Sequence, residues 1–167
     1  QRKARRRRGL PTIALVGYTN AGKSTLLNRI TVAHARVEDR LFSTLDPTTR
    51  RLRLAGGETV LCSDTVGFVR RLPHELVEAF RSTLEMVNDA DLILHVVDGS
   101  APDASAQIDA VRAVLREIGA DEVPELVVLN KADVADPDDV KALLAAEPGA
   151  AVVSAVPGDW GDGLFGT

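Results

Sequence analysis

The apolar residues of this chain fall into short continuous runs separated by longer stretches of helical periodicity. The runs at residues 12–16, 92–97 and 126–129 are rich in branched aliphatic side chains, and residues 150–153 form a shorter run of the same kind. Runs of this length without polar alternation are typical of strands that are buried on both faces. The pattern therefore predicts four buried strands distributed along the chain.

Apolar residues at helical spacing occupy the intervals between these runs. The predicted helices lie at residues 22–30, 73–87, 103–118 and 137–146. Two of them carry clear end signals, because Gly119 follows the third and Pro137 opens the fourth. Alternating buried strands and helices predict an α/β fold, with a mostly parallel sheet covered by helices on both faces.

Two further segments alternate polar and apolar residues. Residues 51–54 and 59–63 flank Gly56-Gly57, a turn signal that predicts an antiparallel hairpin. The hairpin brings the expected sheet to six strands with one antiparallel edge strand. Residues 31–49 are polar and long for a connection, which is typical of a functional loop. A final helix is expected after residues 150–153, and because the chain stops at Thr167 we expect that helix to be missing.

Charge divides the chain into two parts. Six of the 20 basic residues lie among the first eight positions, so the rest carries 14 basic against 24 acidic residues, a formal charge of −10. We interpret residues 1–9 as a basic linker stub from a preceding domain of a longer protein, and residues 10–167 as one domain. The acidic body argues against broad nucleic-acid binding by the domain itself.

Other features of the composition narrow the class of protein. The single cysteine, Cys62, excludes an internal disulfide framework, and no apolar run approaches the roughly 20 residues that span a bilayer. Cys62 and His95 lie in predicted strands and are expected to be structural. Asp98 ends a predicted strand and is expected to cap the next turn.

A phosphate-binding pattern provides the first candidate chemistry. Residues 17–24 match G-x-x-x-x-G-K-[ST] between a predicted strand and a predicted helix. Glycine lets the backbone approach phosphates, and backbone N–H groups at the helix N-terminus supply positive potential. Lys23 can reach the β- and γ-phosphates, and the Ser24 hydroxyl is a hard ligand for Mg²⁺. The expected phosphate-side contacts are Gly17, Tyr18, Thr19, Asn20, Ala21, Gly22, Lys23, Ser24 and Thr25.

Two later motifs extend this site. Asp64 and Gly67 form D-x-x-G after the hairpin, where the carboxylate can face Mg²⁺ and the Gly67 N–H can approach a γ-phosphate. Asn130-Lys131-Ala132-Asp133 follows a buried strand, and its last carboxylate can accept hydrogen bonds from the ring N–H and amine of guanine. Adenine lacks these donors, and leaving a buried polar group unpaired costs about 1–3 kcal/mol. The motifs together predict a P-loop NTPase G domain that binds GTP.

Smaller contributions complete the expected base site. Asn130 can tie this loop to the P-loop, and the Lys131 stem can lie over the base. Ser154-Ala155, after the last predicted strand, can offer a backbone N–H to the guanine carbonyl.

Beyond these general motifs, the sequence resembles the HflX family of translation-factor-related GTPases, over roughly residues 9–163. The stretches that carry the likeness are residues 17–25, 41–50, 64–68, 72–85 and 91–98. The resemblance implies a GTPase that hydrolyses GTP to GDP and phosphate and acts in the cytoplasm on the large (50S) ribosomal subunit, splitting stalled ribosomes. It further implies that the basic start ends a helical linker, that an N-terminal ribosome-contacting domain lies outside this chain, and that the G domain is monomeric.

The resemblance also assigns roles around the γ-phosphate. Thr44 is the threonine implied to reach Mg²⁺ and the γ-phosphate, with Thr48 and Thr49 as alternatives. The expected metal ligands are Ser24, Thr44 and Asp64, and the expected catalytic residues are Lys23, Thr44 and Gly67. In several relatives an asparagine at the position of Asn20 binds K⁺, so either K⁺ is a second cofactor or Asn20 only shapes the loop.

Phe68 stands where Ras-like enzymes carry a water-positioning glutamine, and a phenyl ring cannot orient water by hydrogen bonding. We therefore expect slow hydrolysis by the chain alone and completion by the ribosome. Three alternatives are a regulatory module with negligible turnover, a kinase for a small acceptor, and an Obg-like or tRNA-modifying GTPase. Thr19-Asn20-Ala21 and residues 45–50 favour the HflX type over the last of these.

Overall fold

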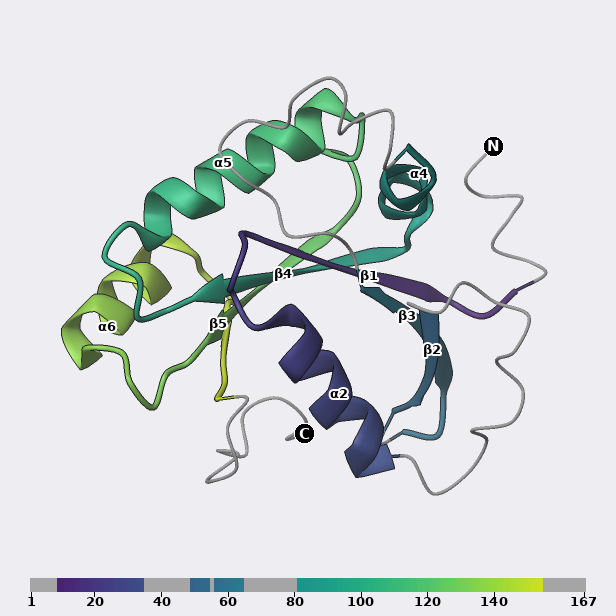
Figure 1. Ribbon diagram of the computed structural model, residues 1–167, viewed down its shortest axis with the longest axis horizontal. Coiled ribbons are helices and arrows are strands. Elements are labelled where there is room, and N and C mark those ends of the chain that lie inside the picture. The colour runs from purple at the N-terminus through teal and green to yellow at the C-terminus, as the bar shows by residue number, and fades with distance from the viewer. Residues whose placement is uncertain (1–8, 35–48, 55, 65–80, 155–167) are drawn as a thin grey trace.

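In the computed structural model, one twisted sheet forms the centre of the protein (Figure 1), and residues 9–34, 49–54, 56–64 and 81–154 are described. Its strands are β1 (Thr12–Gly17), β2 (Thr49–Arg53), β3 (Thr59–Asp64), β4 (Leu92–Asp98), β5 (Glu125–Asn130) and β6 (Ala151–Val152). They lie in the order β2-β3-β1-β4-β5-β6. Among the strand pairs in the described ranges, β2–β3 alone is antiparallel. The predicted mostly parallel sheet with one antiparallel edge strand is confirmed.

Helices cover both faces of this sheet, as Figure 1 shows. The helices within the described ranges are α2 (Lys23–His34), α4 (Arg81–Asp89), α5 (Ala104–Glu117) and α6 (Pro137–Ala146). Side chains of α2 pack on one face of the sheet, whereas side chains of α4, α5 and α6 pack on the other. The predicted two-sided α/β architecture is therefore confirmed.

Alternate residues of each central strand belong to different cores. In β1, Leu15 joins the cluster under α2, whereas Ala14 and Val16 join the cluster under α4 and α5. In β4, Val96 faces α2, whereas Val97 packs with Ile108 of α5. Both faces of a central strand must then be apolar, which explains why these strands read as continuous apolar runs.

The helix boundaries show where the sequence pattern was weaker. The helix predicted at residues 137–146 matches α6, and the one predicted at 103–118 matches α5 within one residue at each end. The helix predicted to end at Ile30 continues to His34, because residues 31–34 contain no glycine or proline to stop it. The described part of the helix predicted at 73–87 is α4, which ends two residues later, at Asp89.

Several predictions fall on residues outside the described ranges. They include most of the connector at residues 35–48, the basic stub at residues 1–8 and the chain end. Among the helices that the structure describes, none is both long and apolar enough to cross a membrane. Cys62 is buried in β3, as expected.

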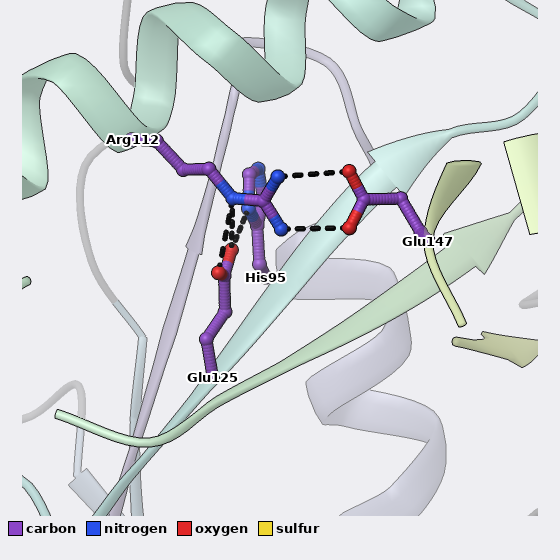
Figure 2. Close-up of polar contacts among 4 residues, drawn as sticks. All are labelled: His95, Arg112, Glu125 and Glu147. Atoms are coloured by element: carbon purple, nitrogen blue, oxygen red, sulfur yellow. Dashed lines mark hydrogen bonds and ion pairs between the residues drawn. The ribbon is translucent and has the colours of Figure 1, made fainter. Parts of the chain in front are cut away.

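A polar cluster joins four elements on the α5 side of the sheet (Figure 2). His95 of β4 is only 1% exposed, and its Nδ1 lies 2.6 Å from Oε1 of Glu125 on β5. Arg112 of α5 donates from Nε to the other oxygen of Glu125 at 3.1 Å. The same guanidinium makes two bonds, of 2.8 and 2.7 Å, to Glu147 at the end of α6. We call these four residues the Arg112 cluster; it ties β4, β5, α5 and α6 together.

The Arg112 cluster fixes the charge of its central carboxylate. Partial burial raises the pKa of Glu125, but hydrogen bonds and charge from His95 and Arg112 outweigh burial and leave the pKa below its ordinary value. A carboxyl group with a lowered folded pKa stabilises the fold above its unfolded pKa, and the stabilisation is lost as pH falls through the folded value.

We predict that Glu125→Gln lowers the free energy of unfolding by about 1–3 kcal/mol at pH 7, because it removes the charged acceptor shared by His95 and Arg112. The difference from the unchanged protein should shrink as pH falls through the lowered pKa of Glu125, since that carboxylate then protonates. Urea unfolding at several pH values measures both effects. Glu117→Gln, an exposed change on α5, is the control and should stay within about 0.5 kcal/mol. A pH-independent loss for Glu125→Gln would contradict the electrostatic explanation.

Candidate nucleotide-binding site

The motif loops converge at one edge of the sheet. Strands β1, β4, β5 and β6 run parallel, so the loops that follow them emerge at the same edge. This edge therefore receives the P-loop after β1, the turn after β4, the Asn130–Asp133 segment after β5 and Ser154 after β6. In parallel α/β sheets the carboxyl ends of the strands are the usual place for a ligand.

The two motif glycines are required by the packing of the protein itself. A Cβ on Gly17 would lie 2.4 Å from the carbonyl oxygen of Val96 on the neighbouring strand. A Cβ on Gly22 would lie 2.4 Å from Nδ2 of Asn130, and Gly22 has a φ of +93°. Both glycines belong to the phosphate-binding motif, where a backbone without side chains lets phosphates approach. The structure adds a second reason, which is contact with β4 and with the base loop.

The start of α2 offers positive potential to an anion. Lys23 and Ser24 are its first two residues, and α2 has no acidic residue in its first turn. The backbone N–H groups at such a terminus carry partial positive charge, and no acidic residue in the first turn of α2 offsets it. Lys23 is buried at 7% exposure, whereas Ser24 is exposed. The chemistry of this terminus suits a phosphate group.

Asn130 connects the base loop to the P-loop. Its side chain is 1% exposed, and Nδ2 donates a 3.0 Å hydrogen bond to the carbonyl oxygen of Ala21. The two residues are 109 positions apart in the chain. The predicted tie between the two loops is confirmed.

The carboxylate expected to recognise the base lies beside the last strand. Asp133 is exposed, and its Oδ1 accepts a 2.7 Å hydrogen bond from Oγ of Ser154. The backbone N–H of Ala132 donates to the carbonyl oxygen of Val153 at 3.2 Å. The structure thus joins Asp133 and Ser154, two residues that were expected separately at the base site, while Ala155 lies outside the described residues.

Lys131 makes contacts that the sequence analysis did not foresee. Its Nζ donates to the carbonyl oxygen of Asn20 at 2.8 Å and to Oδ2 of Asp98 at 2.7 Å. Asp98 also accepts from the N–H and Oγ of Ser100, so the predicted cap of the turn after β4 is confirmed. Asp98 pairs with Asn130 in the register of β4 and β5. Knowledge of this register would have been needed to place Asp98 next to Lys131.

The expected γ-phosphate side is described only in part. Asp64 is the last residue of β3 and pairs with Leu15 of the neighbouring strand β1. Leu15 lies two residues before Gly17, where the P-loop begins, so the backbone of Asp64 lies close to the start of the P-loop. Thr49 lies in β2, where its Oγ1 is 3.2 Å from Oγ of Ser63. The other residues predicted here lie outside the described ranges: Thr44, Thr48, Gly67 and Phe68.

Magnesium fits the donor types at this edge. A serine hydroxyl in the first turn of α2 and a carboxylate-bearing residue at the end of β3 are hard oxygen donors, which Mg²⁺ prefers. The described ranges hold no group of three or more His, Cys, Asp or Glu residues able to bind a metal. Such a group is not needed where hydroxyls, water and phosphates complete the coordination.

A mostly parallel sheet of this strand order, with a P-loop after β1 and Asn130–Asp133 after β5, defines the G domain of a P-loop GTPase. The family model described as 50S ribosome-binding GTPase matches residues 12–131. "GTPase HflX" of Caldanaerobacter subterraneus is 57% identical over 134 residues, which cover 80% of this chain and 31% of that protein. The chain therefore belongs to the family of 50S ribosome-binding GTPases, as a G domain of the HflX type.

Other relatives agree with this assignment. "GTPase HflX" of Escherichia coli K12 is 54% identical over 134 residues, covering 80% of this chain and 31% of that protein. "GTPase HflX" of Gluconacetobacter diazotrophicus is 51% identical over 160 residues, covering 95% of this chain and 35% of that protein. The chain spans about a third of the length of these curated relatives.

Solved structures show the same fold. A GTP-binding protein from Sulfolobus solfataricus in complex with GDP is 30% identical, with a TM-score of 0.65, over 87% of this chain and 47% of that one. The FeoB G-domain of Methanococcus jannaschii is 25% identical, with a TM-score of 0.54, over 86% of this chain and 84% of that one.

We predict that Gly22→Ala abolishes measurable binding of fluorescent GDP, because the new methyl group would collide with the Asn130 amide. Gly57→Ala is a matched control, since Gly57 has a φ of +92° in the hairpin turn but no atom within 4 Å of the added Cβ. Both variants should lose about 1–2 kcal/mol of stability from the positive φ, but only the first should lose nucleotide. Equal binding by the two variants would contradict the packing argument.

Proposed function

We propose that this chain binds GTP with Mg²⁺ and hydrolyses it to GDP and phosphate, as the nucleotide-dependent domain of an HflX-type factor that acts on the large ribosomal subunit in the cytoplasm. The observation that supports this most directly is the joining of the base loop to the P-loop by Asn130 and Lys131. These contacts hold a guanine-reading carboxylate at a fixed distance from a phosphate cradle. A ligand that carries both guanine and phosphates fits this arrangement.

The phosphate end is expected to work mainly by electrostatics. Lys23, the Ser24 hydroxyl and the N–H groups at the start of α2 would neutralise charge that builds up on the β- and γ-phosphates. The proposed ligands of Mg²⁺ are Ser24, Thr44 and Asp64, and the ion would add charge neutralisation at the bridging oxygens. Gly67 would offer a backbone N–H to the γ-phosphate. A K⁺ ion at Asn20 stays a prediction from the resemblance.

The base end is expected to select guanine by hydrogen bonding. Asp133 would accept from the ring N–H and amine of guanine, while Ser154 holds the carboxylate from its other side. Adenine lacks donors on this edge and would make none of the hydrogen bonds that guanine makes with Asp133, which favours GTP over ATP. A kinase that uses ATP is therefore disfavoured.

The ribosomal role rests on the family to which the chain belongs, the 50S ribosome-binding GTPases. Phe68 lacks the hydrogen-bonding groups that orient water, so a partner must supply that contribution for fast turnover. A regulatory module that holds nucleotide with negligible turnover is the second candidate, favoured by the same residue.

We predict that the full-length parent protein hydrolyses GTP slowly alone and about 10³–10⁵-fold faster with purified large ribosomal subunits. Phosphate release measured with large subunits, with small subunits and without ribosomes tests this directly. Lys23→Ala is the inactive control. Turnover that stays negligible with every addition, despite bound nucleotide, would favour the regulatory module.

We predict that Asp133→Asn weakens GDP binding about 10- to 100-fold and raises the affinity for xanthosine diphosphate, because an amide can donate to the xanthine carbonyl. Ser154 can still donate to the remaining carbonyl oxygen, so the loop should keep its shape. Competition binding with GDP, xanthosine diphosphate and ADP measures the change. Asp139→Asn, an exposed change in the first turn of α6, is the control and should bind GDP normally.

A further inference from the structure

We propose that Asp98 is a positioning residue of the nucleotide site, which holds the Lys131 ammonium against the Asn20 carbonyl and so fixes the base loop on the P-loop. The proposal rests on the proposed binding of guanine nucleotides. It concerns a residue at the end of β4 that belongs to none of the nucleotide motifs of the sequence. We call Asp98, Lys131 and Asn20 the lysine bridge.

The lysine bridge joins two strained backbone positions. Within the described ranges, Asn20 and Lys131 are the two non-glycine residues with positive φ, at 63° and 60°. Side chains make this conformation unfavourable, so the surrounding structure must hold it in place. One ammonium group links them, because Nζ of Lys131 lies 2.8 Å from the Asn20 carbonyl oxygen.

Asp98 is itself held in the orientation that this bridge requires. Its Oδ1 accepts from the N–H of Ser100 at 2.9 Å and from Oγ of Ser100 at 2.5 Å. The other oxygen, Oδ2, lies 2.7 Å from Nζ of Lys131. One carboxylate oxygen therefore accepts hydrogen bonds from the turn after β4, and the other accepts from the base loop.

The backbone around Asp98 brings the carboxylate to this place. Asp98 pairs with Asn130 in the β4–β5 register, and the Gly99 N–H donates to the Asn130 carbonyl oxygen at 2.8 Å. Partial burial raises the pKa of Asp98, but hydrogen bonds from Lys131 and Ser100 outweigh it and leave the pKa below its ordinary value. The carboxylate is therefore ionised at neutral pH.

A second point of attachment changes what the loops can do. The Asn130–Ala21 bond alone is one contact about which the base loop can turn relative to the P-loop. The lysine bridge adds a contact one residue further along, and two contacts fix an orientation. A nucleotide that holds both loops gains from this fixed geometry, because less freedom is lost on binding.

The lysine bridge is only partly buried, so its effect on nucleotide release can be measured separately from its effect on folding stability. The side chains of Lys131 and Asp98 are 34% and 18% exposed. Both groups keep access to water, which can replace part of the interaction that a variant loses, so the cost to folding should be modest. Removing the Asp98 charge should therefore change nucleotide release far more than it changes the unfolding midpoint.

The test is the rate at which the purified protein releases fluorescent GDP in the presence of excess unlabelled GDP. Asp98→Asn keeps an oxygen acceptor for Ser100 but removes the charge beside Lys131, and it should speed release about tenfold. Asp109→Asn, the same change at an exposed position of α5, should leave release unchanged. Ser100→Ala should speed release two- to threefold, because Asp98 keeps its charge but loses one of its two orienting bonds.

A double-variant cycle shows whether Asp98 acts through Lys131. Lys131→Met should also speed release, and the variant with both changes should release GDP as fast as Lys131→Met alone. Effects that multiply in the double variant would overturn the proposal, as would unchanged release in Asp98→Asn. A large loss of nucleotide-free stability in Asp98→Asn would also overturn it. If the unchanged protein failed to bind labelled GDP, that result would instead contradict the proposed function.

Discussion

The contact between the Asn130 amide and the P-loop is the constraint on which the arrangement of the site depends. It needs β5 and β1 to end at the same edge of the sheet, separated by β4, so that a side chain of one reaches the loop of the other. It also needs a residue without a side chain at position 22, since an added Cβ would lie 2.4 Å from the amide nitrogen. The strand order and the glycine are thus two requirements of a single buried hydrogen bond.

The buried polar residues lie in two places, at the nucleotide site and in the sheet away from it. The buried polar or charged residues of the described ranges are Lys23, Ser63, His95 and Asn130. Two of them, Lys23 and Asn130, belong to the nucleotide site at the carboxyl ends of the strands. His95 belongs to the Arg112 cluster, whose Glu125 begins β5 while Asn130 ends it. One strand therefore carries a polar anchor at each end and an apolar middle.

The sequence was sufficient for the elements but not for contacts between them. Continuous apolar runs predicted the buried strands because both faces of a parallel sheet are covered, and the turn at Gly56-Gly57 predicted the one antiparallel pair. The motifs predicted the Asn130 tie, whereas the hydrogen bond between Asp133 and Ser154 was not predicted. The Arg112 cluster was not predictable, since Arg112 and Glu147 are 35 residues apart and meet only once α5 and α6 have packed. Neither partner differs in the sequence from an ordinary solvated charge.

The two lysines of the site show how an acidic domain can bind an anion selectively. Lys23 stands at the start of a helix with no acidic residue in its first turn, so its charge adds to that of the helix terminus. Lys131 is paired with Asp98, so its charge is largely cancelled and its role is to hold two loops together. Positive potential is thereby concentrated at the phosphate end, whereas the base end, which would meet a neutral guanine, works through hydrogen-bond geometry. A domain built in this way needs no basic surface to hold a nucleotide, and its overall negative charge would disfavour non-specific binding to other polyanions.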